Sequence, residues 1–160
     1  MIKVGDRVPS VKLKHMTAEG IKDITTDELF KGKKVVLFAL PGAFTPTCSA
    51  KHLPGFVQRA AEIKAKGVDT VACLSVNDAF VMNAWKRDTD QRDEATFLAD
   101  GNAEFTKAIG MELDASGNGL GIRSKRYSML VDDGVVKKFN VEPAPGKVEV
   151  SGGDTLLGQL

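Results

Sequence analysis

Apolar runs and amphipathic segments alternate along the first half of this chain. Residues 35–40 read VVLFAL, a run of the length expected for a fully buried strand. A helical pattern follows over 46–66, stops at Gly67 and is succeeded by a second apolar strand over 70–76. Two strands joined by a helix form a βαβ unit, so we predict parallel strands with a right-handed crossover.

The second half of the chain contains shorter periodic segments. They predict, in order, a helix over 78–88, a strand over 96–99, a helix over 102–109 and strands over 127–131 and 135–139. Asp132, Asp133 and Gly134 lie between the last two strands and predict an antiparallel hairpin. The Gly-rich stretch 111–124 is interpreted as a connection.

This order of elements predicts an α/β fold in which helices cover both faces of a mixed central sheet. A thioredoxin-like fold satisfies it, and a chain of 160 residues has the size of a single domain, so we assign 1–160 to one domain. The net charge of +1 argues against nucleic acid or an anionic membrane surface as the main partner. With no apolar signal core near the start and no transmembrane run, we expect a cytoplasmic protein.

The turn after the first buried strand is the candidate for chemistry. It reads PGAFTPTC from Pro41 to Cys48. Thr45 has the side chain of a helix N-cap, Pro46 fits the first helical position, and Cys48 then falls in the first turn. A thiolate is favoured there by the positive end of the helix dipole. We also expect a kink or break in this helix at Pro54.

The same turn carries a resemblance to a known family. PGAFTPTCS, together with HLPGF at 52–56, CLSVND at 73–78 and RSKRYSMLVDDGVV from Arg123, is similar to the peroxiredoxins, specifically the type II or peroxiredoxin-five subfamily. The similarity extends over almost the whole chain. It implies a thioredoxin-like fold and a thiol peroxidase that reduces hydrogen peroxide and alkyl hydroperoxides without a metal or other cofactor.

The resemblance also assigns roles to residues of the turn. It implies that Cys48 attacks the peroxide and that Thr45 and Arg123 complete the catalytic group. Arg123 is singled out from the neighbouring Arg126 by the family match alone. The other turn residues expected to line the substrate pocket are Pro41, Gly42, Phe44 and Thr47. His52 follows Cys48 by four residues, and we expect it to support the site from behind.

The second cysteine bears on the catalytic cycle. Cys73 lies in the apolar strand VACLSV, where a buried thiol is expected to be inert. Some members of the family carry a resolving cysteine after the final strand, but NVEPAPGKVEVSGG contains none. We therefore expect a one-cysteine cycle in which an external thiol reduces Cys48, with glutathione and glutaredoxin as the favoured donors and thioredoxin as the alternative.

Other interpretations remain open at this point. A disulfide oxidoreductase would need a second cysteine in the turn, where Thr45 stands instead. A Cys–His hydrolase would use His52 as its base, and a peroxide sensor would oxidise Cys48 without turnover. The family resemblance implies a homodimer, and Phe44, Phe80 and Trp85 are candidates for its interface if their side chains are exposed.

Overall fold

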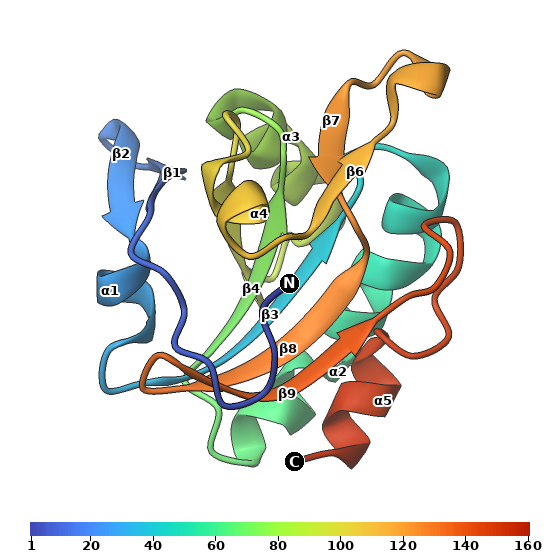
Figure 1. Cartoon of the computed structure of the whole chain (residues 1–160). Helices are drawn as coiled ribbons and strands as arrows, with labels where there is room; N and C mark the ends of the chain where they lie inside the picture. The colour runs from blue at the N-terminus through green and yellow to red at the C-terminus, as the bar shows by residue number, and fades with distance from the viewer.

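A seven-stranded mixed β-sheet forms the centre of the protein, whose computed structural model describes residues 1–160 (Figure 1). The strand order is β2-β1-β5-β4-β3-β8-β9. The strands are β1 (Lys12–Thr17), β2 (Gly20–Thr25), β3 (Lys34–Leu40), β4 (Thr70–Ser75), β5 (Thr96–Ala99), β8 (Tyr127–Asp132) and β9 (Val135–Val141). β3, β4 and β5 run parallel, and β8 pairs antiparallel with β3. The βαβ unit and the terminal hairpin are thus as predicted.

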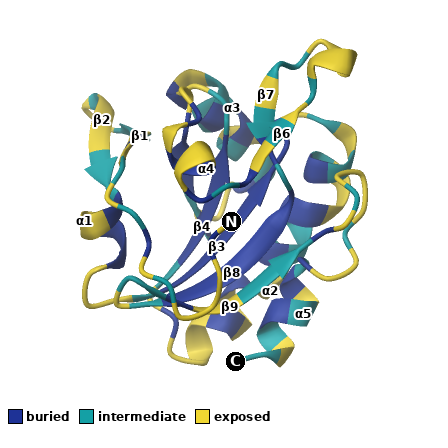
Figure 2. Cartoon of the chain, in the orientation of Figure 1, coloured by how far each residue is buried: buried dark blue, intermediate teal, exposed yellow.

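Helices cover both faces of this sheet, as expected. They are α1 (Thr26–Phe30), α2 (Leu53–Ala65), α3 (Ala79–Thr89), α4 (Glu104–Ala108) and α5 (Gly153–Gly158). The apolar core is divided by the sheet into two clusters. One cluster holds alternate β3 residues with α2, α3 and α5, and the other holds the remaining β3 residues with α1 and α4. The central strands are accordingly buried except at one terminal residue each, as the dark strands in Figure 2 show.

Two parts of the chain are more ordered than the sequence suggested. The Gly-rich stretch 111–124 contains a second, two-stranded sheet of β6 (Glu112–Asp114) and β7 (Ile122–Ser124), joined through the short 3₁₀ turn η2 (Ser116–Asn118). β2 was not predicted at all, because its residues GIKDIT lack a buried apolar face and form an edge of the sheet.

The helix after the reactive turn begins at Pro46 and continues to Ala65, close to the range predicted from its pattern. Its irregularity lies before Pro54, not at it. Cys48–His52 (η1) forms a π-helical turn, and the N–H of Leu53 donates to the carbonyl of Cys48, five residues back. Pro54 directly follows this widened turn, at the second position of α2, and has no N–H to donate. The predicted break is therefore a widened turn at the cysteine itself.

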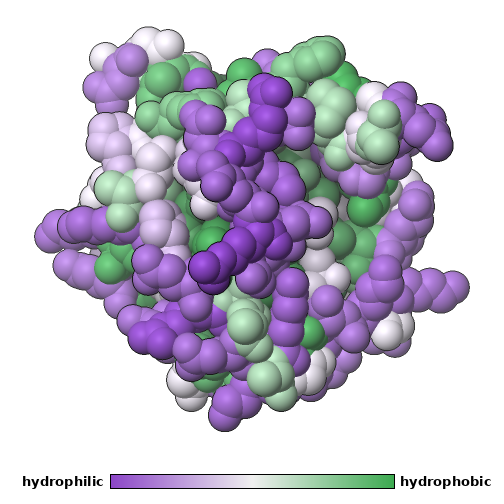
Figure 3. Space-filling view, turned by 180° about the vertical axis from the view of Figure 1, so that it is seen from behind, coloured by the Kyte–Doolittle hydropathy of each residue, from purple (hydrophilic) through white to green (hydrophobic).

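On the face turned away from the view of Figure 1, hydrophilic side chains dominate and the apolar areas between them are small (Figure 3). None of the helices is both long enough and apolar enough to span a lipid bilayer.

Candidate active site

The reactive turn follows β3 at the carboxyl end of the parallel strands, the usual place for a site in an open α/β sheet. Its backbone is fixed from the next strand, because the N–H of Ala43 donates to Oδ1 of Asn77 at 3.0 Å. Phe44 has a φ of 63°, in the left-handed region that residues other than glycine seldom adopt. Cys48 therefore lies in the first turn of the helix, the position that the sequence predicts for it.

Cys48 lies at 0% exposure, and its sulfur faces a cation. Nη2 of Arg126 donates to Cys48 Sγ at 3.2 Å. Arg126 is itself only 2% exposed and forms no ion pair with any carboxylate within 4.0 Å. A buried guanidinium needs a compensating negative charge. Of the three groups that Arg126 contacts, Cys48 is the one whose ionised form is negative.

The arginine that contacts Cys48 is therefore not the one expected from the sequence. Arg123 donates from Nε to the carbonyl of Leu120 at 3.0 Å and from Nη1 to the carbonyl of Pro41 at 3.3 Å, and no hydrogen bond joins it to Cys48. The two arginines are three residues apart: Arg123 lies in β7 of the small β6–β7 sheet, whereas Arg126 lies outside any strand and directly precedes the buried strand β8. Adjacency to that strand is the signal that could have identified Arg126.

His52 contacts the arginine on the side away from the sulfur. Nη1 of Arg126 and Nδ1 of His52 are 3.0 Å apart, and Nε2 of His52 and the carbonyl oxygen of Ser151 are also 3.0 Å apart. Because a guanidinium can only donate, Nδ1 accepts and Nε2 carries the proton. Burial and the charge of Arg126 lower the pKa of His52 from 6.5 to about 3.

The two hydrogen bonds of the His52 ring argue against the Cys–His hydrolase interpretation. Both ring nitrogens of His52 are engaged, one with Arg126 and the other with Ser151. Neither is available to take a proton from Cys48. The geometry therefore gives no Cys–His catalytic pair.

Thr45 occupies the predicted N-cap position, but its side chain does not cap the helix. The first helical bond runs from the N–H of Ser49 to the carbonyl of Thr45 at 3.0 Å. The Thr45 hydroxyl turns back and donates to the carbonyl of Gly42 at 2.7 Å. The tight turn places that carbonyl within reach of the hydroxyl, which leaves the oxygen lone pairs of Thr45 free.

The remaining predicted pocket residues divide into two groups. Pro41 and Gly42 are buried beside Arg123, whose Nη1 would lie 2.7 Å from a Cβ added at Gly42, so a larger residue there would displace the guanidinium. Thr47 is half-buried and donates to the carbonyl of Gly146 at 3.2 Å. Phe44 is 51% exposed, and its ring centre is 6.5 Å from that of Trp85, so its side chain contacts α3.

Cys73 lies in β4, opposite Phe38 and Phe97 in the register, and is fully buried. Burial in apolar surroundings raises its pKa well above the ordinary value of a thiol. Both cysteines are free in this structure. The burial supports the expectation of an inert thiol.

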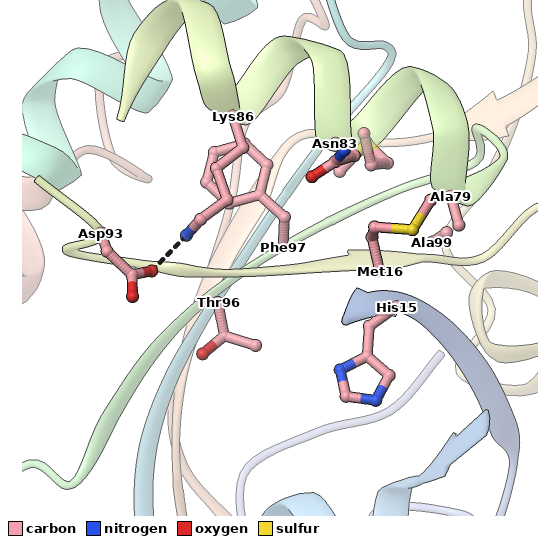
Figure 4. Close-up of a pocket in the computed structure, with 10 residues that line it drawn as sticks. His15, Met16, Ala79, Asn83, Lys86, Asp93, Thr96, Phe97 and Ala99 are labelled. Carbon is pink, nitrogen blue, oxygen red and sulfur yellow. Dashed lines mark ion pairs between the residues drawn. The ribbon is translucent and has the colours of Figure 1, made fainter. Parts of the chain in front are cut away.

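Five cavities on the protein surface are lined by residues other than Cys48. A small cavity of about 150 Å³ between α3, β5 and β1 is lined by His15, Met16 and Phe97 among others, with the ion pair of Lys86 and Asp93 at one side (Figure 4). It contains no cysteine. No cluster of three or more His, Cys, Asp or Glu side chains is arranged to hold a metal ion.

Comparison with known proteins identifies the family. A family model described as Redoxin matches residues 3–157. Among curated proteins, Peroxiredoxin-2E of Arabidopsis thaliana, which is chloroplastic, is 50% identical over 97% of this chain and 68% of its own length. The hybrid peroxiredoxin hyPrx5 of Haemophilus influenzae is 48% identical over 98% of this chain and 65% of its own length.

A solved structure agrees with these relatives in fold as well as in sequence. Reduced Prx3 of Vibrio vulnificus, crystallised in complex with hydrogen peroxide, superposes with a TM-score of 0.94 at 53% identity, and the match covers 99% of both chains. The mixed central sheet with helices on both faces is the fold that the resemblance implied. The chain belongs to the Redoxin family and, within it, to the type II or peroxiredoxin-five peroxiredoxins, which are thiol-dependent peroxidases.

Proposed function

We propose that Cys48 is the thiol that reduces the peroxide and that Arg126 activates it. The observation that carries the proposal is the 3.2 Å contact between Arg126 Nη2 and Cys48 Sγ in a fully buried site. The thiolate attacks one oxygen of hydrogen peroxide or an alkyl hydroperoxide, and the O–O bond breaks. The departing hydroxide or alkoxide takes up a proton, and the cysteine becomes a sulfenic acid.

The surrounding groups have complementary tasks in this step. Arg126 offers fixed donors to the sulfur and to the oxygen under attack, so that charge is stabilised as it moves between them. The free lone pairs of the Thr45 hydroxyl accept a hydrogen bond from the peroxide. Pro41 shields the site from water, and Arg123 holds the Pro41 carbonyl, which makes it a support of the turn and not a partner of the sulfur.

The same proposal includes a one-cysteine cycle. One external thiol attacks the sulfenic sulfur and releases water, and a second thiol resolves the mixed disulfide and restores Cys48. We favour glutathione with glutaredoxin as the donors, and thioredoxin is the alternative. The absence of a cysteine from 140–153 and the burial of Cys73 support this cycle.

Turnover of Cys73→Ser tests the cycle. With glutathione and glutaredoxin, and separately with thioredoxin, we expect this variant to consume hydrogen peroxide at the wild-type rate, because the buried Cys73 thiol takes no part. Peptide mapping under non-reducing conditions is expected to show no bond between residues 48 and 73. A loss of turnover together with that disulfide would refute the one-cysteine cycle.

We also propose that the protein is a homodimer in a reducing compartment, the cytoplasm. The side chains of Phe44 and Phe80 are 51% and 67% exposed, whereas Trp85 is buried, so the two phenylalanines remain as interface candidates. Two free thiols suit a reducing compartment. A monomer mass in solution scattering at micromolar concentration would contradict the dimer, and cell fractionation tests the location.

A further inference from the structure

The segment 142–151 surrounds the active-site arginine, although it contributes no residue to the sulfur. Pro145 accepts a hydrogen bond from Arg126 Nε at 3.0 Å, and the Ser151 carbonyl accepts from His52. Gly146 accepts from Thr47, which precedes Cys48. In Figure 1 the orange-red segment accordingly runs beside the teal turns of the helix that follows Pro46. These three carbonyls all belong to one loop, which contacts the guanidinium directly through Pro145 and indirectly through Ser151 and His52.

The loop is mostly exposed and has little apolar burial to fix it (Figure 2). Its anchor is the buried carboxylate of Glu142. One oxygen, Oε2, accepts from the N–H groups of Glu149, Val150 and Ser151 at 3.0, 2.8 and 2.6 Å, and from the Ser151 hydroxyl at 2.6 Å. The N–H of Glu142 also donates to the carbonyl of Arg126 at 2.9 Å. Four donors on one carboxylate oxygen close the loop into a ring behind the active site.

We propose that Glu142 is a positioning residue for the peroxidase reaction: its carboxylate closes the 142–151 loop, and the loop holds His52 and Arg126 in the orientation that activates Cys48. The chain of contacts runs from Glu142 to Ser151, from Ser151 to His52, from His52 to Arg126 and from Arg126 to the sulfur. Nothing in the peroxide chemistry requires a carboxylate near the sulfur, and Glu142 does not touch Cys48. Its contribution is geometric.

Glu142 is ionised when it makes these bonds. Its burial acts to raise its pKa, but the hydrogen bonds from Ser151, Glu149 and Val150 outweigh burial and hold the pKa below the ordinary value of a glutamate. A charged acceptor gives stronger hydrogen bonds than a neutral one. Replacement by glutamine keeps the shape and one carbonyl oxygen but weakens all four bonds, so it loosens the loop without opening a cavity.

The negative charge of Glu142 and its positioning of Arg126 have opposite effects on the stability of the Cys48 thiolate, so an experiment can separate them. A negative charge close to the site disfavours a second one, so removing it would by itself stabilise the Cys48 thiolate. Loss of positioning lets Arg126 move away from the sulfur and destabilises the thiolate. The proposal therefore predicts a thiolate that forms at higher pH in Glu142→Gln, whereas a purely electrostatic role predicts one that forms at lower pH.

The inference rests on the proposed role of Cys48, and its test is chosen to be independent of turnover. In a Cys73→Ser background, the rate of iodoacetamide alkylation against pH measures the thiolate of Cys48 alone. For Glu142→Gln we expect the midpoint of this profile to move upward by about one pH unit, and the rate constant for hydrogen peroxide at neutral pH to fall about tenfold. Glu142→Ala is expected to show a larger shift in the same direction.

Asp100→Asn is the matched control. The Asp100 carboxylate is also buried and also accepts bonds from the N–H groups of Phe105 and Thr106 and from the Thr106 hydroxyl, but none of its bonds reaches Arg126 or the 142–151 loop. We expect Asp100→Asn to lose stability while its alkylation profile stays that of the wild type. An unchanged or downward-shifted profile in Glu142→Gln, or an equal upward shift in Asp100→Asn, would overturn the proposal. Failure of Cys48→Ser to abolish peroxide reduction would instead refute the proposed function.

Discussion

Replacing Arg126 by lysine is expected to lower the rate constant of the protein with hydrogen peroxide by about 10² to 10³-fold, the loss typical of removing one preorganised donor from a site of developing charge. Lysine keeps the positive charge but lacks the planar fork. Arg126 uses that fork to contact three groups at once, the Cys48 sulfur, the His52 ring and the Pro145 carbonyl. A single ammonium group has no geometry that satisfies all three.

Arg123→Lys is the matched control for this prediction. Arg123 donates to two backbone carbonyls and does not bond to the sulfur, so we expect a loss of less than about tenfold. Trp85 provides the signal for stopped-flow measurements, since it is the one tryptophan of the chain and its Nε1 donates to the hydroxyl of Ser49, next to Cys48. Equal losses in the two variants would show that contact with the sulfur is not what distinguishes the arginines.

The largest expected effect on stability comes from His52. Its pKa is about 3 in the folded protein and near 6.5 when the chain is unfolded. Between these values the unfolded chain binds a proton that the folded protein does not, so the free energy of unfolding falls as the pH falls through this window. The loss is about 1.4 kcal/mol for each pH unit, or about 2 kcal/mol between pH 6.5 and 5.0, and the full stability returns above pH 6.5.

Urea unfolding at pH 7.0 and 5.0 measures this loss. In His52→Gln we expect a difference between the two pH values that is about 2 kcal/mol smaller than in the wild type, because the buried imidazole is gone. His15→Gln is the control: His15 lies in β1 and is not buried, so its replacement is expected to leave the wild-type difference in place. A His52→Gln variant with the full wild-type difference would contradict the neutral, buried imidazole inferred from the bonds to Arg126 and Ser151.

The sequence was most informative where burial is continuous. The run VVLFAL is buried on both faces of the sheet, so its length and composition identify it as a central strand without further context. The β6–β7 sheet was missed because three-residue strands in a Gly-rich stretch have no periodicity to detect. The π-helical turn at Cys48 was likewise hidden, since the spacing of apolar residues hardly changes when one turn is widened.

In the candidate site, too, local sequence signals locate some residues and miss others. Cys48 could be located from the turn residues around it, because a strand end, two prolines and a helix start are local signals. Its cationic partner was missed, because Arg123 and Arg126 are only three residues apart and a single feature, the position of Arg126 directly before β8, distinguishes them. Glu142 was not considered at all: its contacts join backbone groups of one loop, and no residue type in that loop suggests them.

The most direct test of the central claim is the fate of Cys48 after one equivalent of hydrogen peroxide. Wild type, Cys73→Ser and Cys48→Ser are treated with the peroxide in the presence of dimedone, which traps sulfenic acids, and the labelled peptides are located by mass spectrometry. We predict one label, on Cys48, in the first two proteins, and neither label nor peroxide consumption in Cys48→Ser. Stoichiometric peroxide consumption by Cys48→Ser, or a label on Cys73 in the wild type, would contradict the account.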